Sequence, residues 1–535
     1  MKNIICFIVC TVSIVYGSSL YAQRVPVQIT LDGTYGSGGK VEAVVGGQNS
    51  EITAFDITHS DRVTTVFGKV STPTPGIYHI GMMRVDSTGG LVHSFGTGGI
   101  VEQSWGNASD YPIGVPSNIA DADATYIVAG ASSVASSDQL PSVYKFNRKS
   151  GTPDSSFGTN GKVIMPFADH SSGEAVAVYV SGGEYIVFGE SKATDLSGTS
   201  GFGVMQFKSD GTLDSTFGVN GRNVMPALVH SVHGFFLNNS AIFICGICDT
   251  GNHELLIGLL TNKGMPDNGG VNGLIHTGVF LTGDTIFASL EGDNKIVMLL
   301  PTPHSLPTHL TIRRFDSKGI PDSTYGTNGI GPNDITPSYQ PKGFFLSSDN
   351  GEAVCGMTNT EIGHSIYTRI SDTTAHPDPI FNKTGIVEID IDSGKYANYL
   401  KFVEPIGKLD QVGNIKRFIA IGGSIQNGVE HFMVARFIGH PFNGVNSNSP
   451  ESEGLITVYP EPANSNFKIK TISDGIKNVR IVDALGREIM RLGSGISELD
   501  ANTYSANASA IPNGIYYCII QTASRSIVQK FTVTH

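Results

Sequence analysis

A ten-residue turn recurs along this chain, and its recurrence limits the fold more than any other feature of the sequence. Three close copies share the order Asp-Ser-x-Phe/Tyr-Gly-x-Asn-Gly: Thr152–Gly161, Thr212–Gly221 and Ile320–Gly329. Weaker copies begin at Leu31, Leu91, Met265 and Pro377, which places the turns 53 to 62 residues apart. Such a period indicates that one supersecondary unit has been copied and that neighbouring copies stack to form the core.

Each interval contains short runs rich in Val, Ile, Phe and Tyr, separated by Gly, Ser and Asp. In the clearest interval the four runs are Lys162–Met165, Ala175–Val180, Tyr185–Ser191 and Gly203–Lys208. This pattern predicts four antiparallel strands, and no segment shows a sustained helical period. Four strands in about 60 residues are typical of one blade of a β-propeller.

The two ends of the repeat region complement each other. The run Phe432–Phe437 has the pattern that elsewhere precedes a repeat turn, but no turn follows it. The N-terminal end has a turn, Asp32–Gly39, without a full unit before it. These halves complete one blade without an open edge strand. We therefore predict an all-β, seven-bladed propeller of four-stranded blades closed by N- and C-terminal strands, with an open solenoid as the alternative.

A residue that is repeated in every unit is expected to build the unit. We predict that the repeated Phe or Tyr packs between blades and that the repeated Asp caps its turn. The aspartates are Asp32, Asp154, Asp214, Asp267, Asp322 and Asp378. Calcium bound by Asp, Asn and backbone carbonyls of this loop is the alternative, and no other cofactor is expected.

These repeats resemble the delta-60 repeat, a unit of bacterial surface and secreted proteins with a Leu-Asp-x-Ser-Phe-Gly-x-x-Gly core. The resemblance covers about residues 30–438. It implies a propeller-like repeat domain but no general activity.

The N-terminus has the features of a secretory signal peptide. Lys2 is followed by an apolar run from Ile4 to Tyr16, and small-residue cleavage is expected between Ala22 and Gln23. We therefore assign residues 1–22 to the signal peptide and 23–438 to the propeller. No other apolar run approaches the ~20 residues of a transmembrane helix, so no membrane span is expected.

After the propeller the composition changes. Residues 439–454 are rich in Gly, Pro and Asn, which predicts a linker, and a small β domain follows at 455–535. Four motifs stand in this domain: Val458–Asn464, Asp483–Arg487, Gly514–Tyr517 and Val528–Val533.

The order of these motifs resembles the type A C-terminal sorting domain of the Bacteroidetes type IX secretion system, although Glu461 stands where that family usually has Asn. The resemblance implies an Ig-like β-sandwich, recognition by the type IX machinery, and delivery through the periplasm to the cell surface or the medium. The matching sorting-signal residues are Tyr459, Pro460, Pro462, Asp483, Gly486, Arg487, Gly514, Tyr516 and Lys530. An ordinary adhesive β-sandwich is the alternative.

Composition narrows the class of partner. The formal net charge of −12 argues against nucleic acid and anionic membranes. A charged fraction of 15% and 65 glycines suit a turn-dense β protein, because soluble domains usually have about 25% charged residues. We expect a monomer.

Cys245 and Cys248 suggest a redox or metal motif, but they lie three residues apart in a predicted strand. Such positions point to opposite faces, so structural thiols are the preferred interpretation.

Residues outside the repeat pattern are the better candidates for a ligand site. Trp105 with nearby Tyr111, and His304 in a Pro-rich loop, form our hypothetical ligand face. The preferred function is a non-enzymatic secreted or surface propeller that binds protein or glycan. The alternatives are a structural role in the envelope and an extracellular hydrolase or lyase acting on polysaccharide. An enzyme requires a convergent group of non-repeated acids, His or Tyr, and no sequence feature singles one out.

Overall fold

The structure is a computed structural model in which the chain divides into two compact units, residues 1–440 and 441–535. It describes residues 27–535 except for the following positions: 48, 59–61, 107–108, 116–123, 134–138, 238–240, 250–252, 268–271, 284, 292, 303–308, 332–338, 347–351, 359–364, 371–385, 390, 392–394, 407–415, 442–455, 460–462, 464–465, 472–475, 484–486, 493–494, 501–502, 510 and 523–525. The predicted signal peptide and its cleavage site at Ala22 and Gln23 lie outside the described residues.

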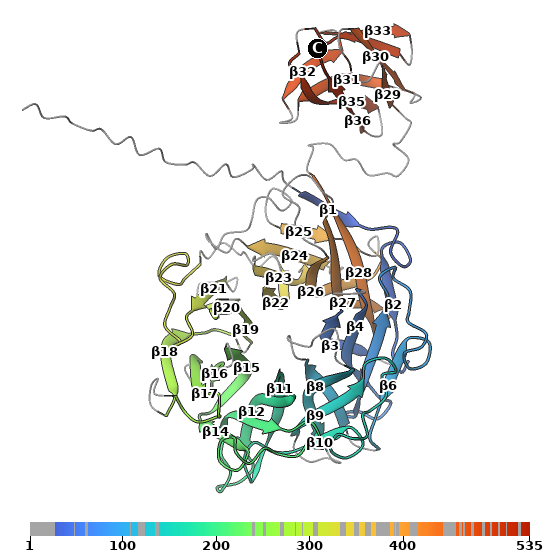
Figure 1. The fold of residues 1–535 in the computed structure, drawn as a ribbon. Coiled ribbons are helices and arrows are strands. Elements are labelled where there is room, and N and C mark those ends of the chain that lie inside the picture. The colour runs from blue at the N-terminus through green and yellow to red at the C-terminus, as the bar shows by residue number, and fades with distance from the viewer. Residues whose placement is uncertain are drawn as a thin grey trace, which may run out of the picture. The chain divides into compact units, whose positions relative to one another are not determined.

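The first unit is a β-propeller whose sheets follow one another around a ring (Figure 1). The first two sheets are β3 (Ser50–Ile57), β4 (Thr64–Ser71), β5 (Tyr78–Val85), β6 (Ile100–Gln103), then β7 (Ser109–Gly114), β8 (Thr125–Ser133), β9 (Leu140–Asn147), β10 (Lys162–Ile164). The next two are β11 (Ser171–Ser181), β12 (Glu184–Ala193), β13 (Gly201–Phe207), β14 (Arg222–Pro226), then β15 (Val229–Leu237), β16 (Ala241–Cys248), β17 (Glu254–Thr261), β18 (Leu274–Phe280). They are followed by β19 (Phe287–Leu290), β20 (Ile296–Thr302), β21 (His309–Phe315), and by β22 (Tyr339–Leu346), β23 (Glu352–Thr358), β24 (Ser365–Ile370), β25 (Ile386–Ile389).

The last sheet joins both ends of the unit. It contains β26 (Ala397–Ile406), β27 (Lys416–Gln426) and β28 (Val429–Pro441), and β28 pairs with both β1 (Val27–Leu31) and β2 (Lys40–Ala43). The innermost strands of neighbouring sheets contact one another from β3 around to β26, and β27 contacts β3. Closure by N- and C-terminal strands is therefore confirmed.

The blades are less uniform than the sequence predicted. We expected seven blades of four strands each. The described residues form six complete sheets, five of four strands and the closing one of five, whereas the β19–β21 sheet has only three strands. Beside β21 an isolated bridge joins Arg313 to Ile330 where other blades have a fourth strand. The described residues therefore form six complete blades, and our prediction of seven is wrong, because beside β21 they make a single bridge where the other blades have a fourth strand.

The repeated turn shows why its residues recur. In four copies the Asp Oδ1 accepts hydrogen bonds from the backbone N–H and the hydroxyl of the Ser or Thr two residues later; the aspartates are Asp32, Asp154, Asp214 and Asp322. The aromatic residues of the turns are fully buried: Tyr35, Phe95, Phe157, Phe217 and Tyr325. Phe95, for example, packs against Tyr126 and Phe146 of the next blade. Turn capping and packing between blades are confirmed for these copies.

A backbone hydrogen bond joins four of these turns to the next blade. The glycine after the aromatic residue donates its N–H to a carbonyl in the following turn: Gly36 to Thr88 (2.9 Å), Gly96 to Ser150 (2.9 Å), Gly158 to Asp210 (2.8 Å) and Gly218 to Lys263 (2.7 Å). The repeat therefore supplies both the turn within a blade and the contact between blades.

The second unit is a small all-β domain. Its strands are β29 (Ile456–Tyr459), β30 (Asn466–Thr471), β31 (Ile476–Asp483), β32 (Glu488–Leu492), β33 (Gly495–Asp500), β34 (Thr503–Asn507), β35 (Gly514–Thr522) and β36 (Ser526–Val533). They form one eight-stranded sheet in the order β29-β30-β34-β33-β32-β31-β35-β36. The sheet nearly closes, because Ala463 bridges Val533 of β36. The prediction of an Ig-like sandwich of separate sheets is wrong, since β32 pairs with β33 and links the two halves.

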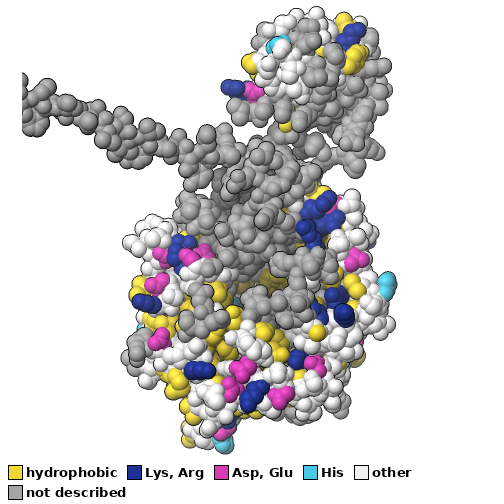
Figure 2. Space-filling model, in the orientation of Figure 1, with side chains coloured by type: hydrophobic (Ala, Val, Ile, Leu, Met, Phe, Trp, Pro, Cys, Tyr) yellow, Lys and Arg dark blue, Asp and Glu magenta, His cyan; other side chains and the backbone are white. Residues whose placement is uncertain are grey.

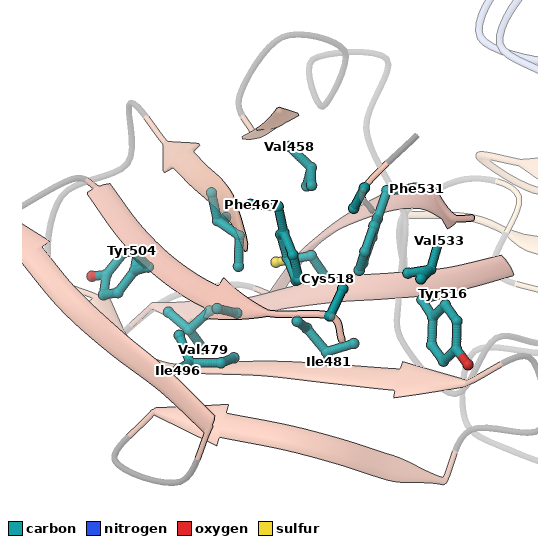
Figure 3. Close-up of a cluster of buried hydrophobic side chains, with 14 of the residues drawn as sticks. Val458, Phe467, Val479, Ile481, Ile496, Tyr504, Tyr516, Cys518, Phe531 and Val533 are labelled. Carbon is teal, nitrogen blue, oxygen red and sulfur yellow. The ribbon is translucent and has the colours of Figure 1, made fainter. Parts of the chain in front are cut away.

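Figure 3 shows the core of this domain, where Phe467, Phe531 and Cys518 lie among aliphatic side chains. The described cysteines Cys245, Cys248 and Cys518 are buried, and none of the three forms a disulfide. Cys245 packs in the cluster that includes Phe315, and Cys248 in the one that includes Phe188, on opposite faces of the blade. The structural interpretation of this pair is confirmed.

Candidate functional site

The two ends of the blades differ in chemistry. The repeated turns occupy one end, which we call the turn face. The other end, where β3 begins, β4 ends and β5 begins, we call the connection face. Because the repeat residues build the turn face, non-repeated side chains are concentrated where the connections differ from blade to blade.

Polar side chains recur at one level of the innermost strands near the connection face. The second strand of six blades contains a glycine. The residue that follows this glycine pairs with a residue of the innermost strand that is polar or a tyrosine: Glu51, Tyr111, Glu174, His230, Gln340 and Tyr399. The facing residues are equally varied: Lys69, Ala131, Glu190, Ile247, Met357 and Gly423. A shared backbone position therefore carries Glu, Tyr, His or Gln, depending on the blade.

A pocket of about 320 Å³ opens where the closing blade meets the first blade. Its lining residues come from the loop before β3, from β3, β4 and β5, and from the β27–β28 hairpin: Asn49, Glu51, Lys69, Ser71, Tyr78, Ile425, Gly428 and Glu430. None of them belongs to the repeated turn. The volume lies at the lower end of the range for small-molecule sites, about 300–1,000 Å³.

An aromatic and cationic cluster forms one wall of this pocket. The Lys69 Nζ lies 3.8 Å from the centroid of the Tyr78 ring and 4.8 Å from that of Tyr111. The two rings meet edge to face at 6.0 Å. Tyr111 in turn donates its hydroxyl to Glu174 Oε1 at 2.6 Å. The wall is therefore held by contacts that span three blades, which keeps the pocket preorganised.

Two carboxylates lie in this pocket in unlike environments. The Glu51 side chain is 54% exposed, and its Oε1 lies 3.3 Å from the Lys401 Nζ. Glu430 accepts the hydroxyl of buried Tyr399, and its backbone N–H donates to Asn49 Oδ1 at 3.0 Å. Burial raises the pKa of Glu430 above its usual 4.5, with a further contribution from Glu51 that the Tyr399 hydrogen bond and Lys401 only partly offset.

Neither Trp105 nor Tyr111 of the predicted ligand face lines the pocket. Trp105 stacks on Tyr144 at 5.3 Å, and its Nε1 donates to the backbone oxygen of Asn160 in the neighbouring turn at 2.9 Å. Trp105 thus packs between two blades and does not line the pocket, whereas Tyr111 lies directly behind its wall. His304 lies outside the described residues. A ligand role for these three residues stays a prediction.

Sequence reasoning missed the residues that line the pocket. Lys69 follows the strand glycine Gly68, and aligning the repeats on that glycine places Lys, Ala, Glu, Ile, Met and Gly at one position. That variability was the available signal. Glu51 and Glu430 are 379 positions apart in the numbering, so no local sequence pattern predicts that they meet.

Metal and membrane features are sparse in the described part of the chain. Among the described residues, no group of three or more His, Cys, Asp or Glu side chains has the arrangement to hold a metal ion. Four of the repeated aspartates that we proposed as alternative calcium ligands, Asp32, Asp154, Asp214 and Asp322, are engaged by Ser, Thr, Arg or Lys. Within these same residues no helix is long and apolar enough to cross a membrane.

Several predicted sorting-signal residues have structural partners. Asp483 and Arg487 flank the turn between β31 and β32 and form an ion pair of 2.7 Å. Tyr516 is buried in β35 and donates its hydroxyl to the Pro512 carbonyl at 2.8 Å. Tyr459 ends β29 and is 40% exposed, Gly514 begins β35, and Lys530 lies in β36. Pro460, Pro462 and Gly486 lie outside the described residues.

Two family models match the chain. Residues 457–534 match the secretion system C-terminal sorting domain, and residues 183–217 match a β-propeller domain of unknown function. The second match spans β12, β13 and the repeat turn that contains Phe217. The chain is therefore a β-propeller protein that carries a C-terminal sorting domain. That domain directs it through the type IX secretion system to the cell surface or the extracellular space.

Solved structures resemble the chain only distantly. An acylaminoacyl peptidase from Pyrococcus horikoshii is 9% identical with a TM-score of 0.36, over 80% of this chain and 59% of the peptidase, so the chain spans less than two thirds of it. The β-propeller domain of the Trilobed protease from Pyrococcus furiosus is 7% identical with a TM-score of 0.34, over 72% and 96%. The α-L-arabinofuranosidase Arb93A from Fusarium graminearum is 10% identical with a TM-score of 0.35, over 74% and 97%. No curated protein sequence matches the chain.

Proposed function

We propose that this secreted propeller binds a glycan in the pocket between its closing and first blades. The observation that supports the proposal is the convergence of Tyr78, Asn49 and two carboxylates in one pocket outside the repeat pattern. Sugar rings pack their C–H faces on aromatic side chains, and their hydroxyls bond to amide and carboxylate groups.

The charges around the pocket favour a neutral glycan. Lys69 lies over the Tyr78 ring, Lys401 lies beside Glu51, and the Lys342 Nζ lies 5.8 Å from the centroid of the Tyr399 ring. Each ammonium group is therefore already stabilised by a group of the protein. An anionic sugar would therefore have to compete with these protein groups for the three ammonium groups.

Screening the full chain on a glycan array and a protein array tests the proposal. We expect a reproducible glycan hit whose affinity falls by about tenfold or more in Tyr78→Ala, since buried aromatic contacts contribute more than ~1 kcal/mol to binding. Tyr459→Ala, which removes an exposed tyrosine of the sorting domain, is the matched control and should bind normally.

Three outcomes contradict the proposal. Glycan binding that is equal in Tyr78→Ala and in the wild type moves the site elsewhere. Hits confined to the protein array replace the glycan by a protein ligand. An array without any hit leaves the envelope role as the better interpretation.

A further inference from the structure

The pocket contains two acids with the different environments that acid–base catalysis needs. Glu430 lies near the start of β28 and is half-buried, whereas Glu51 is exposed on β3. Both line the same 320 Å³ pocket. The sequence alone singled out no such convergent, non-repeated pair, and such a pair is what separates an enzyme from a binding protein here.

Neighbouring groups give the two acids different electrostatic surroundings. The charged and titratable groups around Glu430 are Tyr399, Glu51, Lys401 and Lys342, from strands β26, β3 and β22. Burial dominates among these influences and raises the pKa of Glu430, so this acid holds its proton to higher pH than a glutamate in water. Glu51 has a different neighbour, because its Oε1 lies 3.3 Å from the Lys401 Nζ.

We infer that this pocket hydrolyses the glycan it binds, with Glu430 as the general acid and Glu51 as the general base. The inference rests on the proposed function, because the same pocket must first hold the sugar. Two carboxyl groups that flank a glycosidic bond, one protonated and one ionised, are the usual requirement for glycoside hydrolysis.

The reaction consumes one water. Glu430 donates its proton to the glycosidic oxygen while the bond between that oxygen and the anomeric carbon breaks. Glu51 accepts a proton from the water whose oxygen bonds to the anomeric carbon. Glu51 then releases its proton to solvent and Glu430 takes one from solvent, so both groups are restored without any redox partner.

Tyr399 acts as a positioning residue in this scheme. It is buried, it holds the Glu430 carboxyl through its hydroxyl, and this hydrogen bond favours the ionised acid. Tyr399→Phe removes the bond and raises the pKa of Glu430 further. The high-pH limb of the activity profile should therefore shift to higher pH, which a purely structural role of Tyr399 would not produce.

The test begins with the glycans that the full wild-type chain binds on the array. Each is supplied as a soluble oligosaccharide, and new reducing ends are measured across acidic to neutral pH. We expect cleavage by the wild type and a fall in kcat/KM of about 10²–10⁴-fold in Glu430→Gln and in Glu51→Gln, with binding retained in Glu430→Gln. Glu184→Gln, on the turn face, is the control and should keep full activity.

The outcomes separate the two proposals. Binding without release of reducing ends at any pH overturns the hydrolytic inference and leaves glycan binding intact. Cleavage that survives both glutamine substitutions overturns the assignment of the two acids. An array without glycan hits rejects the proposed function and the inference together, whereas unfolding of the variants is recognised by loss of the wild-type fluorescence of Trp105.

Discussion

Replacing Asp32 by Asn tests whether the ion pair across the chain ends stabilises the propeller. Asp32 is 1% exposed, and its Oδ2 lies 2.7 Å from the Arg436 Nε, joining residues 404 positions apart. Arg436 also donates to the Ser87 carbonyl at 2.7 Å and lies over the Tyr35 ring at 4.7 Å. The guanidinium therefore links the N-terminal turn, the closing blade and the first blade.

The expected magnitude follows from what Asn keeps and what it loses. Asn retains an Oδ1 that accepts from Thr34, so the turn cap survives. It presents an N–H donor to the Arg436 guanidinium, which leaves a largely buried charge without its counter-ion. Breaking one side of a buried ion pair costs about 3–5 kcal/mol, and we expect about 3 kcal/mol because the other contacts of Arg436 remain.

The assay is urea unfolding of the full chain followed by tryptophan fluorescence. The chain has one tryptophan, Trp105, which packs in the propeller, so the signal reports this unit alone. Asp214→Asn is the matched control. Asp214 caps its turn through Thr216, but the residue of this blade that corresponds to Arg436 is the uncharged Gln206. We expect the control to lose less than about 1 kcal/mol. Equal losses in the two variants would refute the argument for closure by charge.

Three further predictions use the repeat as its own control. Phe217→Ala, at a fully buried position, should lower the free energy of unfolding by about 3–5 kcal/mol, whereas Val219→Ala, 61% exposed in the same turn, should change it by under ~0.5 kcal/mol; similar losses would contradict the packing account. Gly264→Ala should cost ~1–3 kcal/mol more than Gly182→Ala, because both glycines have positive φ (71° and 60°) but only at Gly264 would a Cβ lie 2.4 Å from the Phe217 ring. Although burial alone would raise the pKa of Asp322, hydrogen bonds from Thr324 and the nearby Lys295 and Arg314 outweigh it and lower the pKa below 3.8. Because the pKa of Asp322 is lower in the folded state, its ionisation stabilises the fold above the unfolded-state pKa, and this stabilisation is lost as the pH falls through the folded-state pKa. Asp322→Asn should therefore make the free energy of unfolding fall less steeply at acidic pH. An unchanged pH dependence would reject this contribution.

Exposed charges of both signs are mixed on the face of the propeller that Figure 2 shows. Figure 2 shows acidic and basic side chains interspersed around the described part of the propeller on the face toward the viewer. Long-range attraction is therefore a weak basis for recognition here, and the candidate site depends on short-range contacts in the pocket.

The repeat by itself determined the propeller, its closure and the role of the turn residues. This was predictable because Asp capping, glycine at positive φ and aromatic packing are local requirements that every copy must meet, as at Asp154, Phe157 and Gly158. The motifs of the C-terminal domain identified the sorting signal, but not its single nearly closed sheet, because the β32–β33 pairing has no sequence signature.

Only the tertiary structure decided where the non-repeated residues meet. Tyr399 and Glu430 stand on neighbouring parts of the closing blade, and ring closure brings them beside Glu51 of the first blade. That neighbourhood depends on how many blades complete the ring and on which strands pair across the ends, both of which are long-range properties. Trp105 illustrates the converse: its rarity suggested a ligand contact, but its surroundings place it in the packing between two blades.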